Sequence, residues 1–329
     1  MNEPFDASAL DIDAEAEATR IAEVIVSAVE RSRRKGVIVA VSGGIDSSVV
    51  AALATRALGP SRVHALHLPE QESSGETLPL SRELTDWLGV ESTVENISPV
   101  LEAFDCYRRR DDAIRSVVPE YGPGYRSKIV LPSVADSDAY RLYSVVVEAP
   151  DGTQTTRRLS HGAYLEIVAA TNFKQRSRKV LEYYHADRLN YIVAGTPNRL
   201  EYDQGFFVKL GDGAADVKPI AHLYKSQVYA LAAHLGVPES IRSRPSTTDT
   251  YSLPQSQEEF YFSLPYHRMD LCLYGLNNGV PVDEVAKAVG LTVEQVSRVY
   301  RDIEQKRRTT AYLHDAPILV DDVAEVRSH

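Results

Sequence analysis

Residues 37–58 read VIVAVSGGIDSSVVAALATRAL and combine an apolar run, a cluster of small residues and a second apolar run. Residues 37–41 form a short β-branched run that predicts a buried strand, and residues 49–58 have the periodicity of a helix. Between them, the small residues at 42–48 let backbone N–H groups and the start of the helix face a phosphate. These residues therefore predict a strand, an anion-binding loop and a helix in succession.

The same alternation of strands and helices continues on both sides of a central interruption. Alternating elements of this kind predict an α/β fold with a doubly wound, mainly parallel sheet. The predicted strands are 62–69, 92–97 and 191–195, and the predicted helices are 78–88, a helix beginning at 100, 163–185 and 225–235.

The chain is predicted to form a single domain, 1–329, with three additions to the alternating core. Residues 12–35 have the pattern of an amphipathic N-terminal helix, and residues 265–310 form a helical C-terminal part. Residues 106–160 break the alternation and are interpreted as an insertion containing one hairpin. The alternation at 143–147 and the turn residues at 150–152 support that hairpin.

Composition excludes several classes of function. The chain has 36 basic and 46 acidic side chains, a net charge of −10, so it should repel nucleic acid. Cys106 and Cys272 form no CxxC motif, which argues against a structural zinc site or a disulfide framework. The N-terminus has no apolar export segment, and no stretch of about 18 apolar residues occurs. We expect a globular, cytoplasmic protein without membrane segments.

The loop SGGIDSS at 42–48 carries the clearest chemical signal. It is neither a Walker A loop nor a GxGxxG dinucleotide loop, and Asp46 could hold Mg²⁺ on the bound phosphates. The loop resembles that of the N-type ATP pyrophosphatases, which cut ATP between its α and β phosphates. Residues 195–228 and 171–190 are similar to the corresponding blocks of NAD synthetases, so the resemblance covers most of the chain.

This resemblance implies an ammonia-dependent ligase. In the family, ATP adenylates the nicotinate carboxylate of deamido-NAD, pyrophosphate leaves, and ammonia displaces AMP to give NAD. By resemblance, Asp46, Glu201 and Lys225 are the expected catalytic residues, with Asp46 and Glu201 as Mg²⁺ ligands. The expected ATP-binding residues are Ser42, Gly43, Gly44, Asp46, Ser47, Ser48, His67, Leu68, Thr196, Lys225 and Thr247. The expected deamido-NAD-binding residues are Arg176, Lys209, Asp216, Gln305 and Lys306.

Three departures from the family pattern keep a second hypothesis open. Gln305 stands where the family usually has a histidine, residues 255–262 read QSQEEFYF in place of an acidic segment, and compact members lack the insertion. The alternative is an amide ligase of the same kind that acts on another carboxylate in a specialised pathway. A relative that modifies transfer RNA is disfavoured by the acidic charge and the missing cysteine motifs.

Two further expectations concern partners. The chain has no spare segment for a glutaminase, so ammonia is expected to arrive free or from a separate protein, and family members of this type are usually homodimers. From a different class, residues 282–308 resemble a helix-turn-helix with a basic end, which would suggest DNA binding. The acidic charge of the whole chain opposes that interpretation.

Overall fold

The computed structural model describes residues 4–131, 143–245, 250–321 and 323. Its centre is a parallel sheet of β1 (Val37–Ala40), β2 (Val63–His67), β3 (Glu91–Val94) and β7 (Ile192–Ala194), in the order β3-β2-β1-β7. All three neighbouring pairs are parallel, with Val37 beside Val63 on one side and Ile192 on the other. The predicted α/β fold with a mainly parallel sheet is confirmed.

The strand order creates a natural binding crevice. The chain runs from β1 to β2 on one side, and β7 lies on the other side of β1. Loops that leave the carboxyl ends of β1 and β7 therefore run in opposite directions and leave a crevice between them. Ligands of such sheets bind in this crevice. The SGGIDSS loop at 42–48, called the phosphate loop below, follows β1, and Thr196 follows β7, so the topology brings these two segments to one edge.

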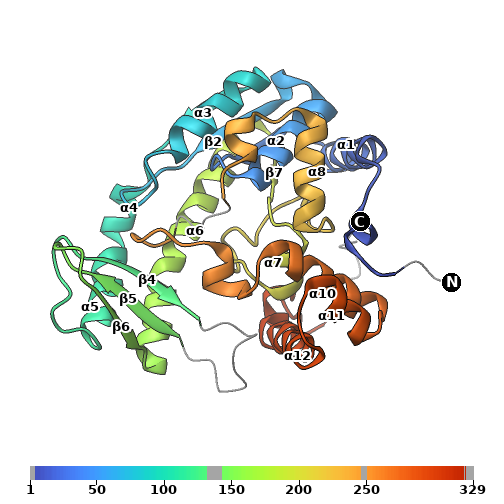
Figure 1. The fold of residues 1–329 in the computed structure, drawn as a ribbon. Coiled ribbons are helices and arrows are strands. Elements are labelled where there is room, and N and C mark those ends of the chain that lie inside the picture. Colours follow the sequence, from blue (N-terminus) through green and yellow to red (C-terminus); the bar gives the residue numbers. More distant parts are fainter. Residues whose placement is uncertain (1–3, 132–142, 246–249, 322, 324–329) are drawn as a thin grey trace.

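Helices cover both faces of this sheet (Figure 1). Along β1, Val37 and Val39 join the core on one face while Ile38 joins the core on the other, because successive strand side chains alternate. One face packs against α1 (Ala14–Arg31), α2 (Ile45–Leu58), α3 (Thr77–Leu88) and α8 (Lys225–Leu235). The other packs against α4 (Ser98–Ala103), α5 (Cys106–Arg115) and α6 (His161–Leu189).

The region predicted as an insertion contains more structure than one hairpin. Strands β5 (Ser144–Glu148) and β6 (Gln154–Arg158) form the hairpin, and β4 (Arg126–Val130) pairs antiparallel with β5 to make a three-stranded sheet. A hairpin turn is a local signal, whereas β4 finds its partner across an intervening segment, which local patterning does not reveal. This sheet packs through Ile129, Val145 and Val147 on the first half of α6.

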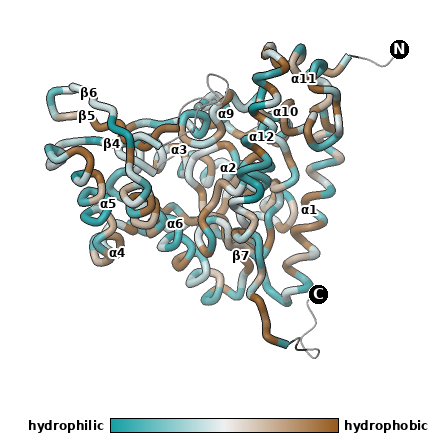
Figure 2. The backbone as a smooth tube through the Cα atoms, turned by 90° about the horizontal axis from the view of Figure 1, so that it is seen from below, coloured by the Kyte–Doolittle hydropathy of each residue, from teal (hydrophilic) through white to brown (hydrophobic). Residues whose placement is uncertain are grey.

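The C-terminal part has a separate helical core. Helices α10 (Tyr266–Asn278), α11 (Val282–Val289) and α12 (Val293–Thr310) pack with α7 (Arg199–Gln204) and the N-terminal turn η1 (Ala7–Leu10). Figure 2 shows the sheet of β4, β5 and β6 and these helices on opposite sides of the central unit. The remaining short elements are η2 (Pro60–Arg62), α9 (Glu239–Arg242), η3 (Glu258–Phe262) and η4 (Ala311–Leu313). Within the described ranges, no helix has the length and hydropathy needed to cross a membrane.

Candidate active site

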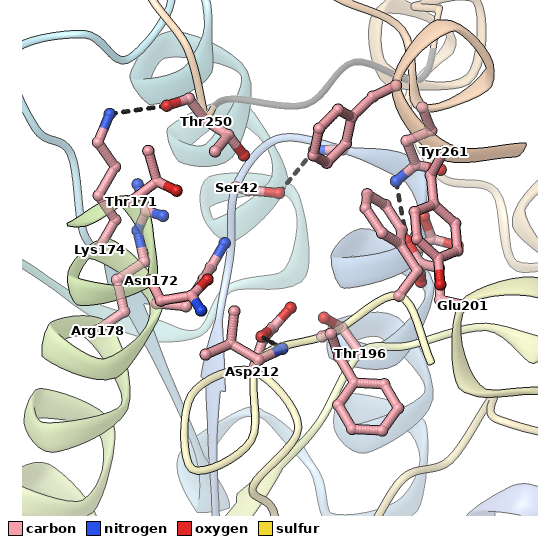
Figure 3. A pocket seen from close by; sticks show the side chains of 18 of the residues that line it. Ser42, Thr171, Asn172, Lys174, Arg178, Thr196, Glu201, Asp212, Thr250 and Tyr261 are labelled. Carbon is pink, nitrogen blue, oxygen red and sulfur yellow. Dashed lines mark hydrogen bonds between the residues drawn. The ribbon is translucent and has the colours of Figure 1, made fainter. Parts of the chain in front are cut away.

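A cavity of about 1150 Å³ lies at the predicted edge of the sheet (Figure 3). The phosphate loop, the end of β2, and the segment after β7 form one part of its wall. A stripe of α6 side chains forms another part, and the insertion and α12 close the rest. Segments that are distant in sequence therefore meet in one concave space, which is where a substrate is expected to bind.

The phosphate loop adopts a conformation that requires glycine at position 43. Gly43 has φ +71°, and a Cβ there would lie 2.9 Å from the carbonyl oxygen of Thr77. The Ser47 and Ser48 hydroxyls donate to the carbonyl oxygen of Gly44 at 3.1 and 2.8 Å, which fixes the start of α2. In the described part of the chain no side chain caps this helix, so N–H groups of its first turn remain for an anion.

Asp46 is paired with a buried lysine. The ammonium group of Lys225, at the start of α8, donates to Asp46 Oδ2, and the Lys225 side chain is only 2% exposed. Burial alone would lower the pKa of Lys225, but the charges of Asp46 and Glu201 outweigh it and raise the pKa above its ordinary value. Asp270 accepts the backbone N–H groups of Lys225 at 3.1 Å and Ser226 at 2.7 Å, which holds the start of α8 in place.

Glu201 lies beside this pair and is held by two further residues. Asn198 donates its side-chain amide to Asp46 Oδ1 at 3.1 Å and its backbone N–H to Glu201 Oε2 at 3.0 Å. Gln257 donates to Glu201 Oε1 at 2.8 Å. Burial, followed by the negative charge of Asp46, raises the pKa of Glu201 to about 8. Asn198 therefore links the two carboxylates that the sequence singled out.

These two carboxylates suit a hard divalent cation. Among the described residues, no cluster of three or more His, Cys, Asp or Glu side chains forms a ready-made metal site. Mg²⁺ usually binds one or two protein carboxylates and takes its other oxygens from phosphates and water. Burial, and then the negative charge of Asp46, raises the pKa of Glu201, and a cation held by the two carboxylates would favour the charged form of both. Asp46 and Glu201 therefore fit a metal that arrives with a phosphate ligand.

The end of β2 contributes the residues expected near adenine. His67 and Leu68 both line the cavity and are buried. Among the described residues, neither ring nitrogen of His67 has a hydrogen-bond partner. Burial, and then the charge of Arg82, lowers the pKa of His67, which keeps the ring neutral near pH 7. A neutral imidazole with two open positions can both donate to and accept from a base.

Four of the predicted acceptor-binding residues line the cavity: Arg176, Lys209, Gln305 and Lys306. Arg176 donates to the carbonyl oxygen of Lys209 at 3.3 Å, and Lys209 donates to the carbonyl oxygen of Asp315 at 3.2 Å. Lys306 is nearly buried and donates to the carbonyl oxygen of Tyr261 at 2.7 Å. The structure thus gathers these cations from α6, the loop after α7, and α12.

Asp216 is placed elsewhere. It does not line the large cavity, and its Oδ2 accepts the backbone N–H of Val193 on β7 at 2.7 Å while Tyr183 donates to Oδ1 at 3.3 Å. It borders a separate small pocket with Arg34 and Tyr183. Within this chain, the structure does not bring Asp216 to the other predicted acceptor residues. Thr247, the last predicted ATP contact, lies outside the described residues.

The sequence patterns did not identify several residues of the site. Asn198 begins the pattern N-x-x-E, a helix capping box that the structure confirms for α7 and that could have located it. Gln257 and Asp212 had no such signal. Asp212 lines the cavity near Thr196 (Figure 3), accepts the backbone N–H of Val208 at 2.7 Å, and has its pKa raised by burial.

A buried ion network ties α5 to the cavity wall. Lys174 on α6 is 1% exposed and contacts Glu70 at 2.9 Å, Glu72 at 2.7 Å and the carbonyl oxygen of Thr250 at 2.9 Å. Arg110 on α5 contacts Glu72 at 2.6 Å. Since Glu70 and Glu72 follow β2, this network holds the segment beside His67 against α5 and α6.

Replacing Glu72 by glutamine should destabilise the fold in a pH-dependent way. Burial raises the pKa of Glu72, but Lys174 and Arg110 outweigh it and hold the pKa below its ordinary value. The ionised Glu72 carboxylate therefore stabilises the fold at any pH above the ordinary carboxyl pKa. This stabilisation is lost as the pH falls through the lowered pKa of Glu72 in the folded protein. We expect E72Q to lose about 3 kcal/mol in urea unfolding at pH 7, with the loss shrinking in acid.

The matched control is Glu120→Gln, because Glu120 is exposed. It should leave the free energy of unfolding within about 0.5 kcal/mol of the wild type. An E72Q loss that stayed constant from neutral to acidic pH would contradict the ionic role assigned to Glu72.

The fold and the SGGIDSS loop together define an α/β protein with an anion-binding loop at the carboxyl edge of a parallel sheet. The family model for NAD synthase matches residues 17–119 and 143–311. The chain belongs to the NAD synthase family.

Individual relatives agree with this assignment. The chain is 60% identical to the NH(3)-dependent NAD(+) synthetase of Rhizobium meliloti strain 1021, covering 98% of this chain and 96% of that protein. It is 33% identical to the protein of the same name from Thermotoga maritima, covering 90% and 96%.

Solved structures show the same fold at low identity. The NMN synthetase of Francisella tularensis aligns with a TM-score of 0.66 and 21% identity, covering 95% of this chain and 100% of that one. The NH3-dependent NAD synthetase of Campylobacter jejuni aligns with a TM-score of 0.62 and 24% identity, covering 94% and 100%.

Proposed function

We propose that this chain is an ammonia-dependent NAD synthetase that uses ATP to convert the nicotinate carboxylate of deamido-NAD into an amide. The observation that carries the proposal is the linked group of Asp46, Lys225, Asn198 and Glu201 beside the phosphate loop. This arrangement combines carboxylates for a cation with a buried ammonium, next to N–H groups suited to phosphates. The names of relatives with up to 60% identity support the same reaction.

In the first step, a carboxylate oxygen of the acceptor attacks the α phosphorus of ATP. The bond from that phosphorus to the oxygen bridging to the β phosphate breaks, and pyrophosphate leaves with its electron pair. Lys225 and the N–H groups of the phosphate loop stabilise the charge that builds on the leaving group. Mg²⁺, held by Asp46 and Glu201, would neutralise phosphate charge and orient the chain of phosphates.

In the second step, ammonia attacks the acyl carbon, the bond from that carbon to the phosphate oxygen of AMP breaks, and AMP leaves with the electron pair while the nitrogen releases one proton to solvent. At neutral pH most ammonia is present as ammonium, which must bind as a cation and lose a proton before it can attack. Asp212 is a partly buried carboxylate at the cavity, and desolvation raises its pKa, which makes it a stronger base. We assign Asp212 to this role, with Lys179 and Glu182 nearby but occupied by their own pair at 2.6 Å.

Replacing Asp212 by asparagine should reduce ammonia-dependent turnover by about a hundredfold. Pyrophosphate release measured in the first turnover should remain, because the carboxylate acts after adenylation. Hydroxylamine, which is uncharged at neutral pH, serves as the control nucleophile and should react at nearly the wild-type rate. Equal losses with ammonium and hydroxylamine would contradict the assignment.

The direct test of the proposed function uses purified protein with ATP, Mg²⁺, ammonium and deamido-NAD. Mass spectrometry should show NAD, AMP and pyrophosphate in equal amounts. The alternative, an amide ligase for another carboxylate, is favoured by Gln305, by residues 255–262 and by the insertion. Nicotinate mononucleotide and a panel of carboxylates, followed by pyrophosphate release, separate the two hypotheses.

We propose a homodimer that takes free ammonia or ammonia from a separate protein, and light scattering at several protein concentrations tests the dimer. The DNA-binding alternative loses its main support, because α12 turns Arg298, Arg301, Gln305 and Lys306 toward the cavity while Val296, Val299 and Ile303 are buried in the helical core.

A further inference from the structure

The cavity is longer than the region around the phosphate loop. Its α6 lining extends from Tyr164 to Glu182, 18 positions apart, which corresponds to about 27 Å along the helix. The two ends differ in chemistry. Lys179, Glu182 and Asp212 lie at one end, whereas Tyr164 lies at the end that packs on the insertion.

Four aromatic rings gather at the insertion end. All four line the cavity: Tyr143, Tyr164, Phe260 and Tyr261. The first immediately precedes β5, the second lies on α6, and the last two lie on η3. The rings of Tyr143 and Tyr164 are stacked, with centroids 4.3 Å apart and planes 13° from parallel. Burial raises the pKa of both phenols, so both rings stay neutral at working pH.

These rings contact the neighbouring apolar core but are only partly buried. Tyr143, Tyr164 and Phe260 pack against the apolar core of the insertion as partly buried residues. Their contact with the cavity therefore leaves aromatic surface that a ligand can cover. A flat ring would gain both apolar burial and stacking there.

The aromatic wall is tied to the proposed reaction centre. Gln257, which directly precedes η3, donates to Glu201 at 2.8 Å. The Tyr261 hydroxyl donates to the carbonyl oxygen of Gln204 at the end of α7, at 2.7 Å. Lys306 lies over the Tyr261 ring, 4.4 Å from its centroid. A ligand that reached from Glu201 to Tyr164 would thus contact one continuous surface.

We propose that Tyr143, Tyr164 and Phe260 form a subsite that stacks a planar ring of the carboxylate acceptor, with Tyr261 at its border, where Lys306 and Phe206 contact its ring. This inference rests on the proposed function, in which ATP occupies the phosphate loop and the end of β2. The acceptor must place its carboxylate near Asp46 and Glu201, and the rest of the molecule then has the aromatic end available. Through Tyr143, the insertion contributes directly to acceptor recognition.

The test compares Tyr164→Leu and Tyr143→Leu with the corresponding phenylalanine variants. Leucine keeps apolar contact with the insertion core but removes the aromatic face, so the KM for deamido-NAD should rise about tenfold. The KM for ATP and kcat should stay within about twofold of wild type. The phenylalanine variants should restore the wild-type KM, because stacking needs the ring and not the hydroxyl.

Tyr125→Leu is the matched control. Tyr125 packs on the same insertion core but does not line the cavity. It should leave both KM values unchanged, and equal effects of Tyr125→Leu and Tyr164→Leu on acceptor KM would overturn the subsite. An acceptor KM that is unchanged in both cavity leucine variants would overturn it as well.

Two acceptors identify which ring is stacked. A KM increase with deamido-NAD but not with nicotinate mononucleotide assigns the subsite to the purine ring, and an increase with both assigns it to the pyridine ring. Wild-type protein that forms no NAD from deamido-NAD refutes the proposed function. Normal wild-type NAD formation with unchanged KM in the leucine variants refutes the aromatic subsite alone.

Discussion

Asparagine at position 46 is expected to reduce pyrophosphate release about a thousandfold or more. The change keeps the size of the side chain and removes the charge that pairs with Lys225 and would bind Mg²⁺. Rapid-quench measurement of pyrophosphate, with saturating ATP and acceptor, checks the result. The loss should appear in kcat, because the charge acts on the phosphates as the bond breaks.

One side effect of this substitution needs its own control. D46N leaves Lys225 buried without its ionic partner, which by itself destabilises the fold. The double variant D46N/K225M removes both charges and should recover thermal stability without recovering activity. Normal pyrophosphate release from folded D46N protein would contradict the role of Asp46.

Glutamine at position 201 is expected to give the second largest loss, about a hundredfold to a thousandfold in kcat. Its amide oxygen can still accept the backbone N–H of Asn198, because a capping box takes either glutamate or glutamine at the N3 position. The substitution therefore preserves the start of α7 and removes mainly the negative charge. Titration with Mg²⁺ at fixed ATP should show that much more metal is needed for half-maximal rate.

The matched control for this change is Glu294→Gln. Glu294 also lies in the first turn of a capped helix, α12, but it is exposed. It should leave kcat and the Mg²⁺ dependence unchanged. An E201Q protein with unchanged metal dependence would remove Glu201 from the proposed cation site, even if its turnover were low.

Local patterning was sufficient for the parallel sheet and for the phosphate loop. Strand β1 carries apolar residues on both faces, and the loop after it contains the small residues, the acid and the hydroxyls in seven consecutive positions. Both signals lie within a few residues of one another, so no distant contact is needed to recognise them. The same holds for the hairpin of β5 and β6, which its turn residues predicted.

Long-range packing decided the rest. Strand β4 pairs with β5 across an intervening segment. Asp216 accepts the N–H of Val193, because β7 lies at the edge of the described sheet and this backbone donor needs a partner. Asp212, Gln257 and the four aromatic rings belong to the cavity only because α6, η3 and the insertion converge there. Sequence spacing does not predict this convergence, because the burial and the contact partners of these cavity residues are set by the whole fold. Charge and loop chemistry could therefore be inferred from the residues, but the shape that selects an acceptor came from tertiary structure.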